Sequence, residues 1–391
     1  MTPAARLQAA IEILDAVVDA ARSGGAAADT LIARYFKTRR YAGSKDRRAI
    51  RDLAYAAIRR AGEVPANGRA ALIGLVADRP ELAALFDGSP HGPAPITGEA
   101  GAPAGVAPGW LTERLAASLA PDELPALLTR APLDLRVNRL KADRAAVLDM
   151  VPEGTPGTLS PDAVRLPEGT QVEALPAFAD GLIEVQDEGS QLVAQAAAAA
   201  PGMTVVDLCA GAGGKTLALA AEMANQGRLI ACDVDRARLQ RLTPRAERAS
   251  ASVETRLLDA GRETVALAEL HDQADVVLVD APCSGTGTWR RNPEARWRLT
   301  PQRLERLCAM QAHVLALAAP LVKPGGRLVY AVCSLLDEEG RDQAEAFLRD
   351  HPGWSAATLP IPARPHGPGA RLTPASDAVD GFFVAAFVRA C

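Results

Sequence analysis

Two cysteines lie where the chain pattern favours chemistry over simple packing. Cys283 lies in DAPCSGTG (280–287) and Cys333 in AVCS (331–334), and each motif completes an apolar run that predicts a β-strand. If these strands are neighbours in one sheet, they lie roughly 5 Å apart, and both thiols reach one pocket. Buried cysteines outside such loops usually act as small apolar residues. That interpretation is applied to Cys232, Cys308 and Cys391.

Paired thiols suit a covalent reaction on a pyrimidine ring. Cytosine C5 is a poor nucleophile until a thiolate adds to C6, after which C5 is enamine-like and can take a methyl group. Loss of the C5 proton and expulsion of the thiolate restore aromaticity, and a second thiol can assist that release. Asp280, in a protonated form, is placed to bond N3, and Lys215 can stabilise Asp280 or the thiolate. The residues alone leave open which cysteine attacks.

A glycine-rich loop, CAGAGGKT (209–216), follows the first strand of the α/β region and precedes a predicted helix. Its glycines let the backbone approach a ligand closely, and the helix start presents unpaired N–H groups. A Walker A loop would need glycine where Cys209 stands, which weakens a kinase or ATPase interpretation.

Acidic residues end the next three predicted strands. Asp233 stands about 20 residues after the glycines, where Rossmann-like folds bind ribose hydroxyls. Asp259 ends the third strand, where a carboxylate can reach an adenine edge, and Asp280 ends the fourth. Asp235 is predicted to cap a helix. One such acid would be an ordinary turn residue, but three in succession indicate a nucleotide-like cofactor.

The elements that must position these groups form an α/β domain. Apolar runs separated by helical segments predict six strands, at 203–209, 228–234, 252–259, 274–280, 326–334 and 381–390. Continuous apolar strands with intervening helices are typical of a doubly wound, mostly parallel sheet covered on both faces. Ligands bind such sheets at the carboxyl ends of the strands.

The whole chain is predicted to contain three domains and a linker. Residues 1–86 show helical spacing and predict an all-α domain, and residues 87–109 are a linker rich in proline and glycine. Residues 110–180 predict a small α/β domain with a strand at 133–138. Residues 181–391 hold the doubly wound domain.

The net charge and the spacing of the cysteines restrict the classes of function that the sequence allows. The chain of 391 residues has a net charge of −4, so any nucleic-acid contact must use local basic patches. Residues 34–60 carry ten Lys or Arg and two acids. We expect RNA phosphates to contact this segment and a second basic group, formed by Arg290, Arg291, Arg296 and Arg298. None of the six cysteines forms a CxxC pair, so no metal site is expected.

No uncharged apolar run predicts a membrane span, and the N-terminal segment is an amphipathic helix rather than a signal peptide. Cytoplasmic localisation with reduced thiols is therefore expected.

Within residues 135–387 the chain resembles the bacterial Sun/Fmu-type 16S rRNA cytosine-C5 methyltransferases of the NOL1/NOP2/Sun family. The segments that carry the resemblance are LRVN (135–138), VQDEGSQLVAQ (185–195), VVDLCAGAGGKT (205–216), ACDVD (231–235), LVDAPCSGTGTWRRNPEARW (278–297), AVCSLLDEEG (331–340) and DGFFVAAF (380–387). Many members have proline where Ala212 stands and threonine where Val332 stands. Both are backbone-shaping positions rather than reacting groups.

The resemblance implies a Rossmann-like class I methyltransferase domain that uses S-adenosylmethionine. It implies that Cys333 is the nucleophile and that Cys283 is the release thiol, whereas DNA cytosine methyltransferases attack with the cysteine of the Pro-Cys motif. The implied cofactor contacts are Cys209, Ala210, Gly211, Ala212, Gly213, Gly214, Lys215, Asp233, Asp259 and Asp280.

The resemblance also extends to the remaining domains and to the partner. The helical domain is loosely similar to an antitermination-factor-like RNA-binding domain, and the small α/β domain to an RNA-recognition-like domain. The implied partner is RNA, namely 16S rRNA, bound by a monomer.

Three other functions remain open at this point. The same chemistry could act on tRNA or another rRNA. The cofactor fold could serve a small-molecule or protein methyltransferase, although transfer to N or O needs no covalent thiol adduct. Alternatively, the chain could be a non-catalytic RNA-binding factor in ribosome assembly, although the set of Asp280, Cys283 and Cys333 argues against this.

Overall fold

The computed structural model describes residues 1–391, which form two compact units. The helical unit comprises residues 1–130 together with 288–301, and the sheet unit comprises residues 131–287 and 302–391. The division into domains at 1–86, 87–109, 110–180 and 181–391 stays a prediction. No helix of the structure combines the length and the apolar character needed to cross a membrane.

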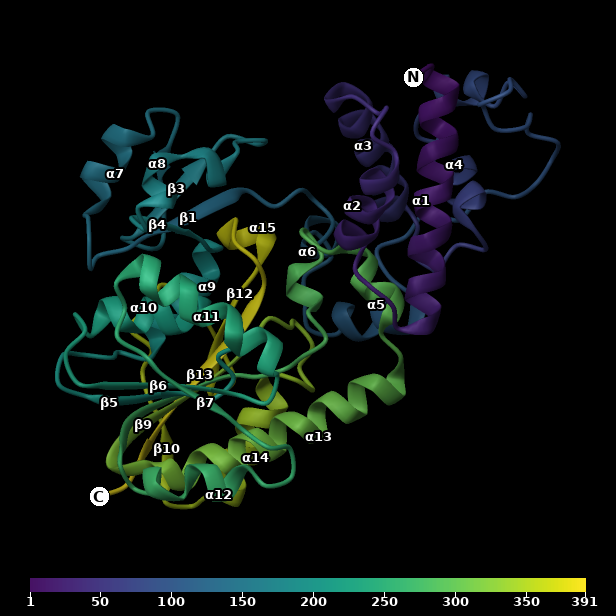
Figure 1. Cartoon of the computed structure of the whole chain (residues 1–391). Coiled ribbons are helices and arrows are strands. Elements are labelled where there is room, and N and C mark those ends of the chain that lie inside the picture. Colours follow the sequence, from purple (N-terminus) through teal and green to yellow (C-terminus); the bar gives the residue numbers. More distant parts are fainter. The chain divides into compact units, whose positions relative to one another are not determined.

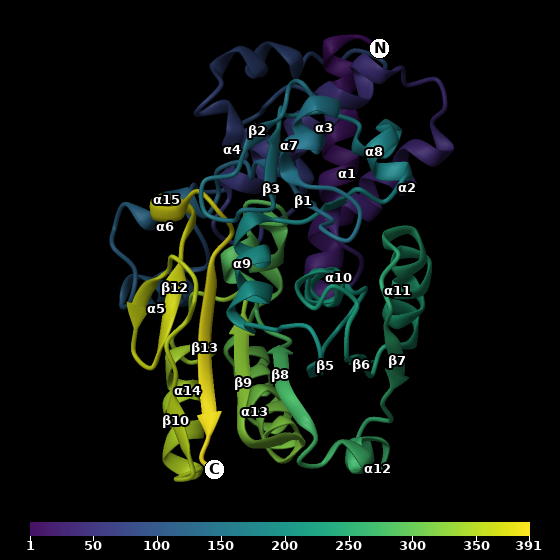
Figure 2. The same cartoon turned by 90° about the vertical axis from the view of Figure 1, so that its left-hand side faces the viewer.

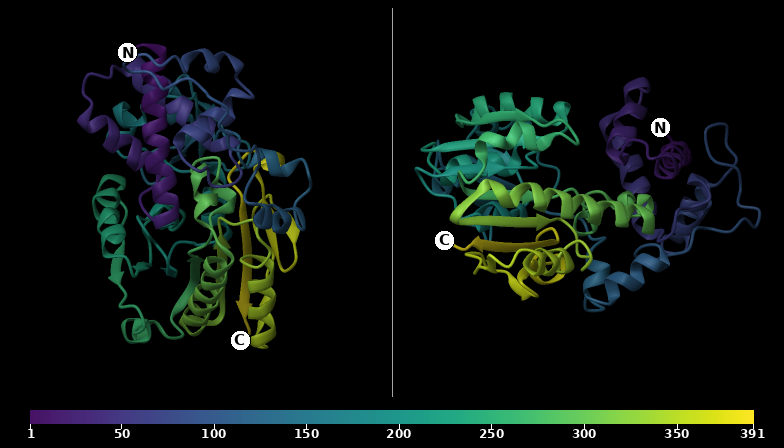
Figure 3. Two further views of the ribbon diagram at one scale, coloured as in Figure 1. Left: turned by 90° about the vertical axis from the view of Figure 1, so that its right-hand side faces the viewer. Right: turned by 90° about the horizontal axis from the view of Figure 1, so that it is seen from below.

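The helical unit is built around α1 (Figure 3, purple). Its elements are α1 (Pro3–Ser23), α2 (Ala28–Thr38), α3 (Ser44–Arg60), α4 (Gly68–Val76), η1 (Pro80–Leu85), α5 (Gly109–Ala116), α6 (Glu123–Ala126) and η5 (Pro293–Arg298). The Thr2 hydroxyl caps α1 by accepting a hydrogen bond from the N–H of Ala5. The helical spacing predicted for residues 1–86 is interrupted after α4, because Pro80 lacks an N–H and disfavours helical backbone at Arg79.

Segment 288–301 is an integral part of the helical unit. Trp297 is buried in the helical core, and its indole N–H donates to the carbonyl of Ala61 at 3.0 Å. Glu294 accepts a hydrogen bond from the N–H of Ala28 at 2.9 Å. Because no side chain caps α2 from its own N-cap position, Glu294 supplies the missing acceptor.

The expectation that the arginines of this segment hold RNA phosphates is wrong for those that are buried. Arg296 is fully buried and donates to the carbonyls of Pro293, Ile58, Arg59 and Ala61. Arg290 is also buried and donates to the carbonyl of Arg130, and Arg298 donates to the carbonyls of Gly25 and Ala26. The sequence showed the charge of these side chains but not the carbonyl groups that surround them.

The sheet unit begins with a small antiparallel sheet of order β2-β3-β1-β4. Its strands are β1 (Leu133–Val137), β2 (Thr155–Pro156), β3 (Ala163–Leu166) and β4 (Ile183–Val185), accompanied by α7 (Arg144–Met150), η2 (Val172–Ala174) and α8 (Pro176–Ala179). Leu135, Val164 and Ile183 form part of its own apolar core. The predicted strand at 133–138 corresponds to β1.

The larger sheet has nine strands, with the order β11-β12-β13-β9-β8-β5-β6-β7 and β10 paired to β13 (Figure 2). The strands are β5 (Thr204–Asp207), β6 (Arg228–Asp233), β7 (Glu254–Leu257), β8 (Ala274–Asp280), β9 (Val322–Val332), β10 (Trp354–Ala356), β11 (Arg364–His366), β12 (Gly369–Leu372) and β13 (Phe382–Arg389). The strands β9, β8, β5, β6 and β7 are parallel to one another. The pairs β10–β13, β11–β12, β12–β13 and β13–β9 are antiparallel. The predicted doubly wound sheet and its six strands are confirmed.

Helices cover both faces of this sheet (Figure 1). One face carries α9 (Glu188–Ala196), α10 (Gly214–Glu222) and α11 (Arg236–Ala249), and the other carries α12 (Glu263–Leu267), α13 (Pro301–Ala318) and α14 (Arg341–Asp350). Successive strand residues point to opposite faces, so Val205 packs with the first group and Val206 with the second. The remaining short elements are η3 (Ala268–Leu270), η4 (Thr286–Thr288), η6 (Ala319–Leu321) and α15 (Pro374–Asp377).

The strand order places the candidate site. β5 lies between β6 and β8, so the chain crosses from one side of β5 to the other, and ligands of such sheets bind at the carboxyl ends of the strands beside this switch point. The glycine loop leaves β5, and the two cysteine loops leave β8 and β9. The sheet therefore brings together segments that are far apart in the sequence.

Candidate active site

The two cysteine loops meet at the carboxyl ends of neighbouring strands. β8 pairs in parallel with β9, with Asp280 opposite Ala331, which confirms that these strands flank each other. Cys283 Sγ and Cys333 Sγ lie 3.3 Å apart, and both residues are free thiols that are partly exposed. The pair is close enough for a hydrogen bond or a proton transfer between the sulfurs.

Lys215 and Asp280 form an ion pair beside the thiols. Lys215 lies in the first turn of α10, Asp280 ends β8, and the Lys215 Nζ–Asp280 Oδ2 distance is 2.7 Å. Burial by itself lowers the pKa of the Lys215 ammonium, but the charge of Asp280 and the hydrogen bond to it, with a smaller contribution from the Cys333 sulfur, outweigh burial and raise that pKa. Lys215 therefore stays a cation that serves both the carboxylate and the nearby sulfur.

The glycine loop between β5 and α10 has backbone geometry that favours glycine. Gly211 and Gly213 have φ angles of +57° and +84°. A Cβ at Gly213 would lie 2.1 Å from the Leu242 Cδ1 atom of α11, so a larger residue would collide there. Gly213 has no side chain to cap α10, so the first N–H groups of that helix lack a local side-chain acceptor.

Asp233, at the end of β6, anchors the glycine loop through hydrogen bonds to its carboxylate. Its carboxylate accepts hydrogen bonds from the N–H groups of Gly211 and Asp235, both at 2.7 Å. Asp235 caps α11 by accepting from the N–H of Arg238, which confirms its predicted role. Val234 between the two acids is 55% exposed and offers an apolar surface at this edge.

Asp259 lies just beyond β7 and is exposed, with its carbonyl accepting from the N–H of Arg262 at 2.9 Å. The structure thus places Asp233 against the glycine loop, while Asp259 sits at the same edge of the sheet, two strands away from β5.

Two residues of the site region were missed at the sequence level. Asp207 is buried at the end of β5, and one of its oxygens accepts from the Thr216 hydroxyl at 2.7 Å while the other has no partner. Burial raises the pKa of Asp207 to about 7. The second is Glu339, whose fully buried carboxylate lies between the cysteine loops. In the sequence it is indistinguishable from its neighbour Glu338.

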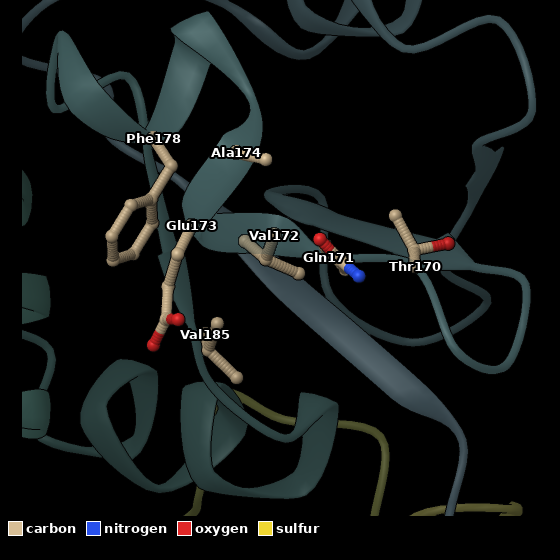
Figure 4. Close-up of a pocket in the computed structure, with 7 residues that line it drawn as sticks. All are labelled: Thr170, Gln171, Val172, Glu173, Ala174, Phe178 and Val185. Atoms are coloured by element: carbon tan, nitrogen blue, oxygen red, sulfur yellow. The ribbon is translucent and has the colours of Figure 1, made fainter. Parts of the chain in front are cut away.

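A separate hollow of about 560 Å³ lies in the small α/β region and contains none of the predicted site residues. Phe178, Glu173 and Val185 lie toward one end, and Gln171 and Thr170 toward the other (Figure 4). Its lining contains no thiol and no lysine.

The strand order, the glycine loop after β5 and the acid at the end of β6 together define a class I methyltransferase domain. The sequence model described as 16S rRNA methyltransferase RsmB/F matches residues 194–388. The chain belongs to this family, whose members depend on S-adenosylmethionine.

Individual relatives agree with this assignment. The chain is 37% identical over 290 residues to the ribosomal RNA small subunit methyltransferase B of Salmonella newport (strain SL254), and the match spans 72% of this chain and 66% of that protein. A solved structure named PH0851 is 25% identical, with a TM-score of 0.78 and 99% of both chains covered. NSun6 from Pyrococcus horikoshii, solved with SFG, shares the fold at 19% identity and a TM-score of 0.66, over 73% of this chain and 98% of that one.

Proposed function

We propose that this protein transfers a methyl group from S-adenosylmethionine to C5 of a cytosine in 16S rRNA. The observation that carries the proposal is the 3.3 Å separation of the Cys283 and Cys333 sulfurs beside the Lys215–Asp280 ion pair. A methyltransferase acting on N or O needs no such thiol pair. The relatives named ribosomal RNA small subunit methyltransferase B support the choice of RNA, although the match spans 66% of their length.

In this proposal Cys333 is the nucleophile. A free cysteine has a pKa near 8.5, so attack at neutral pH requires stabilisation of the thiolate. The Lys215 ammonium supplies a positive charge that interacts with Cys333. The Cys333 sulfur bonds to C6 of the base, and the electron pair moves toward C5. The proton that the Cys333 thiol releases passes to Asp280, the ion-pair partner of Lys215 in the resting site, and Asp280 in this protonated form bonds N3.

Cys283 completes the cycle in the same proposal. After C5 has accepted the methyl group, its proton must leave and the bond between C6 and the Cys333 sulfur must break. Because the two sulfurs lie 3.3 Å apart, Cys283 is next to any base that is attached to Cys333. As the bond from C6 breaks, its electron pair returns to the Cys333 sulfur, which takes the proton of the Cys283 thiol. The resulting Cys283 thiolate accepts the C5 proton, and the electron pair of the C5–H bond restores the C5–C6 double bond.

The residues at the adjacent edge fit S-adenosylmethionine, whose sulfonium would supply the methyl group. The left-handed glycines and the uncapped start of α10 leave room and N–H donors for a ligand. Asp233 would accept from ribose hydroxyls, and Val234 offers apolar surface next to it. Asp259 and residues 209–215 are proposed to complete the cofactor contacts.

Sequencing of bisulfite-treated RNA tests the proposal. Comparing cells with and without the protein should reveal one cytosine of 16S rRNA that resists conversion only when the protein is present. A protected cytosine in tRNA or another rRNA would redirect the substrate, since the same site chemistry applies. A non-catalytic assembly factor would leave every cytosine unchanged.

We place the reaction in the cytoplasm and propose that the protein acts as a monomer.

The exposed cations of segment 34–60 are proposed to bind RNA phosphates. Those on the surface are Arg34, Lys37, Arg40, Lys45, Arg47, Arg48 and Arg51. Arg60 instead bonds Asp78 and the carbonyl of Ala102, so it has a structural role.

The double variant Arg40→Gln, Arg48→Gln should bind RNA more weakly, and its affinity should depend less on salt concentration. Each lost phosphate contact should reduce the slope of log K against log salt concentration by roughly 0.7–0.9. The matched control replaces Lys323 and Arg349, which are exposed cations of the sheet unit. Binding titrations at several salt concentrations measure the slope, and equal slopes in the two double variants would remove segment 34–60 from the RNA surface.

A further inference from the structure

The carboxylate of Glu339 is fully buried and saturated with hydrogen-bond donors. One oxygen accepts from the Ser284 N–H at 2.8 Å and from the Gln311 side-chain amide at 3.0 Å. The other accepts from the hydroxyls of Ser284 and Ser334. Four donors around one acceptor group suit an ionised carboxylate, which only accepts hydrogen bonds.

These partners are the residues that directly follow the two thiols. Ser284 follows Cys283 and Ser334 follows Cys333, and their hydroxyl oxygens lie 3.2 Å apart. Gln311 on α13 holds Glu339 in place and also donates to the carbonyl of Pro282, the residue before Cys283. One carboxylate therefore ties the loop after β8 to the loop after β9.

The charges around the two sulfurs differ. The hydrogen bond to Cys333 and burial raise the pKa of the Cys283 thiol, and the negative charges of Cys333 and Glu339 raise it further, against a smaller effect of the Gly285 N–H. Lys215 is the cation that interacts with Cys333. Negative charge is thus disfavoured at Cys283.

We propose that Glu339 is a positioning residue of this site, which fixes the spacing of the two thiols and keeps Cys283 protonated so that Cys333 is the sulfur that reacts. The inference rests on the proposed function for its catalytic meaning. Its structural content concerns the free protein alone. That content is the tether, meaning the hydrogen bonds by which Glu339 joins the loops after β8 and β9, and the difference in reactivity between the two thiols.

Two variants separate the tether from the charge. Glu339→Gln keeps the size of the side chain, and its amide can donate to the Ser284 and Ser334 hydroxyls while its oxygen accepts from Ser284 N–H and Gln311. Glu339→Ala removes both the tether and the charge. The matched control is Glu338→Gln, which removes one negative charge from the adjacent residue.

The first measurement is brief alkylation of the full-length protein with iodoacetamide from pH 6 to 10, with each cysteine quantified by mass spectrometry. In the natural protein Cys333 should be labelled faster than Cys283. In Glu339→Gln, labelling of Cys283 at neutral pH should rise about three- to tenfold, because one unit of pKa corresponds to a tenfold change in thiolate fraction. Glu338→Gln should leave the ratio unchanged.

The second measurement is RNA methylation kinetics. Glu339→Ala should lower kcat by about a hundredfold with little change in the KM for RNA, because misplacing reacting groups by an ångström costs that much. Glu339→Gln should recover most of the loss. Unchanged Cys283 labelling in Glu339→Gln, or a natural kcat in Glu339→Ala, would overturn the inference. Labelling needs neither RNA nor cofactor. If Cys283 labelling rises in Glu339→Gln as expected but the natural protein methylates no RNA, the result would refute the proposed function and not the inference about Glu339.

Discussion

Cys333→Ala is expected to form no product and no covalent RNA complex, whereas Cys283→Ala is expected to accumulate a complex that survives denaturation. The reason is the division of labour proposed for the two sulfurs, which lie 3.3 Å apart. Without Cys333 no thiolate attacks C6, so the reaction never begins. Without Cys283 the attack and methyl transfer still occur, but release stalls while the base remains bonded to Cys333.

Denaturing gel electrophoresis of each variant with labelled RNA and S-adenosylmethionine measures the complex. The double variant is the control, and its lack of a complex would show that the Cys283→Ala complex depends on Cys333. A complex in Cys333→Ala in place of Cys283→Ala would reverse the roles of the thiols. Activity in both single variants without any complex would exclude covalent catalysis.

Arg296→Met should destabilise the helical unit by about 2–5 kcal/mol. The substitution removes the Arg296 donors to the carbonyls of Pro293, Ile58 and Arg59, around a fully buried side chain. The Ala61 carbonyl loses one of its two donors and keeps the Trp297 indole N–H. A buried polar group without a partner costs about 1–3 kcal/mol, and such costs are only partly additive. Methionine fills much of the volume, so the lost hydrogen bonds dominate.

Urea unfolding followed by tryptophan fluorescence measures this loss. Trp110, Trp289 and Trp297 lie in the helical unit, and only the fourth tryptophan, Trp354, lies in the sheet unit, so the signal mainly reports the helical unit. Arg349→Met, at an exposed arginine of the sheet unit, is the matched control and should change the stability by less than about 0.5 kcal/mol. If Arg296→Met instead bound RNA more weakly while its free energy of unfolding was unchanged, Arg296 would be an RNA-contacting residue.

The parts of the site that follow strand ends were predictable from the sequence. Apolar runs identified β8 and β9, and the rule that parallel strands present their carboxyl ends together brought Cys283 and Cys333 to one edge. Asp233 and Asp235 were predictable for the same reason, since a glycine loop and a helix start fix what lies near them. Their catalytic and cofactor roles stay predictions.

Groups whose role depends on distant burial were not predictable. Glu339 and Glu338 are adjacent acids of the same type, and only the packing of α13 and the cysteine loops distinguishes the buried one. Similarly, the arginines of η5 resemble an RNA-binding patch until the carbonyls of α3 are seen around Arg296. Sequence periodicity carries no information about partners more than 200 residues away, which is the separation of Arg296 from Ile58.

The position of η5 in the chain has a consequence for synthesis on the ribosome. The helical core includes Trp297, so residues 1–130 lack part of their interior until translation has passed Pro301. By that point β1 to β8 have already been synthesised. Domains usually fold in order as they are synthesised, from the N-terminus onward. Here the first unit to emerge is completed only after most of the second has been made, so the nascent chain must hold an unfinished helical core while the sheet is assembled.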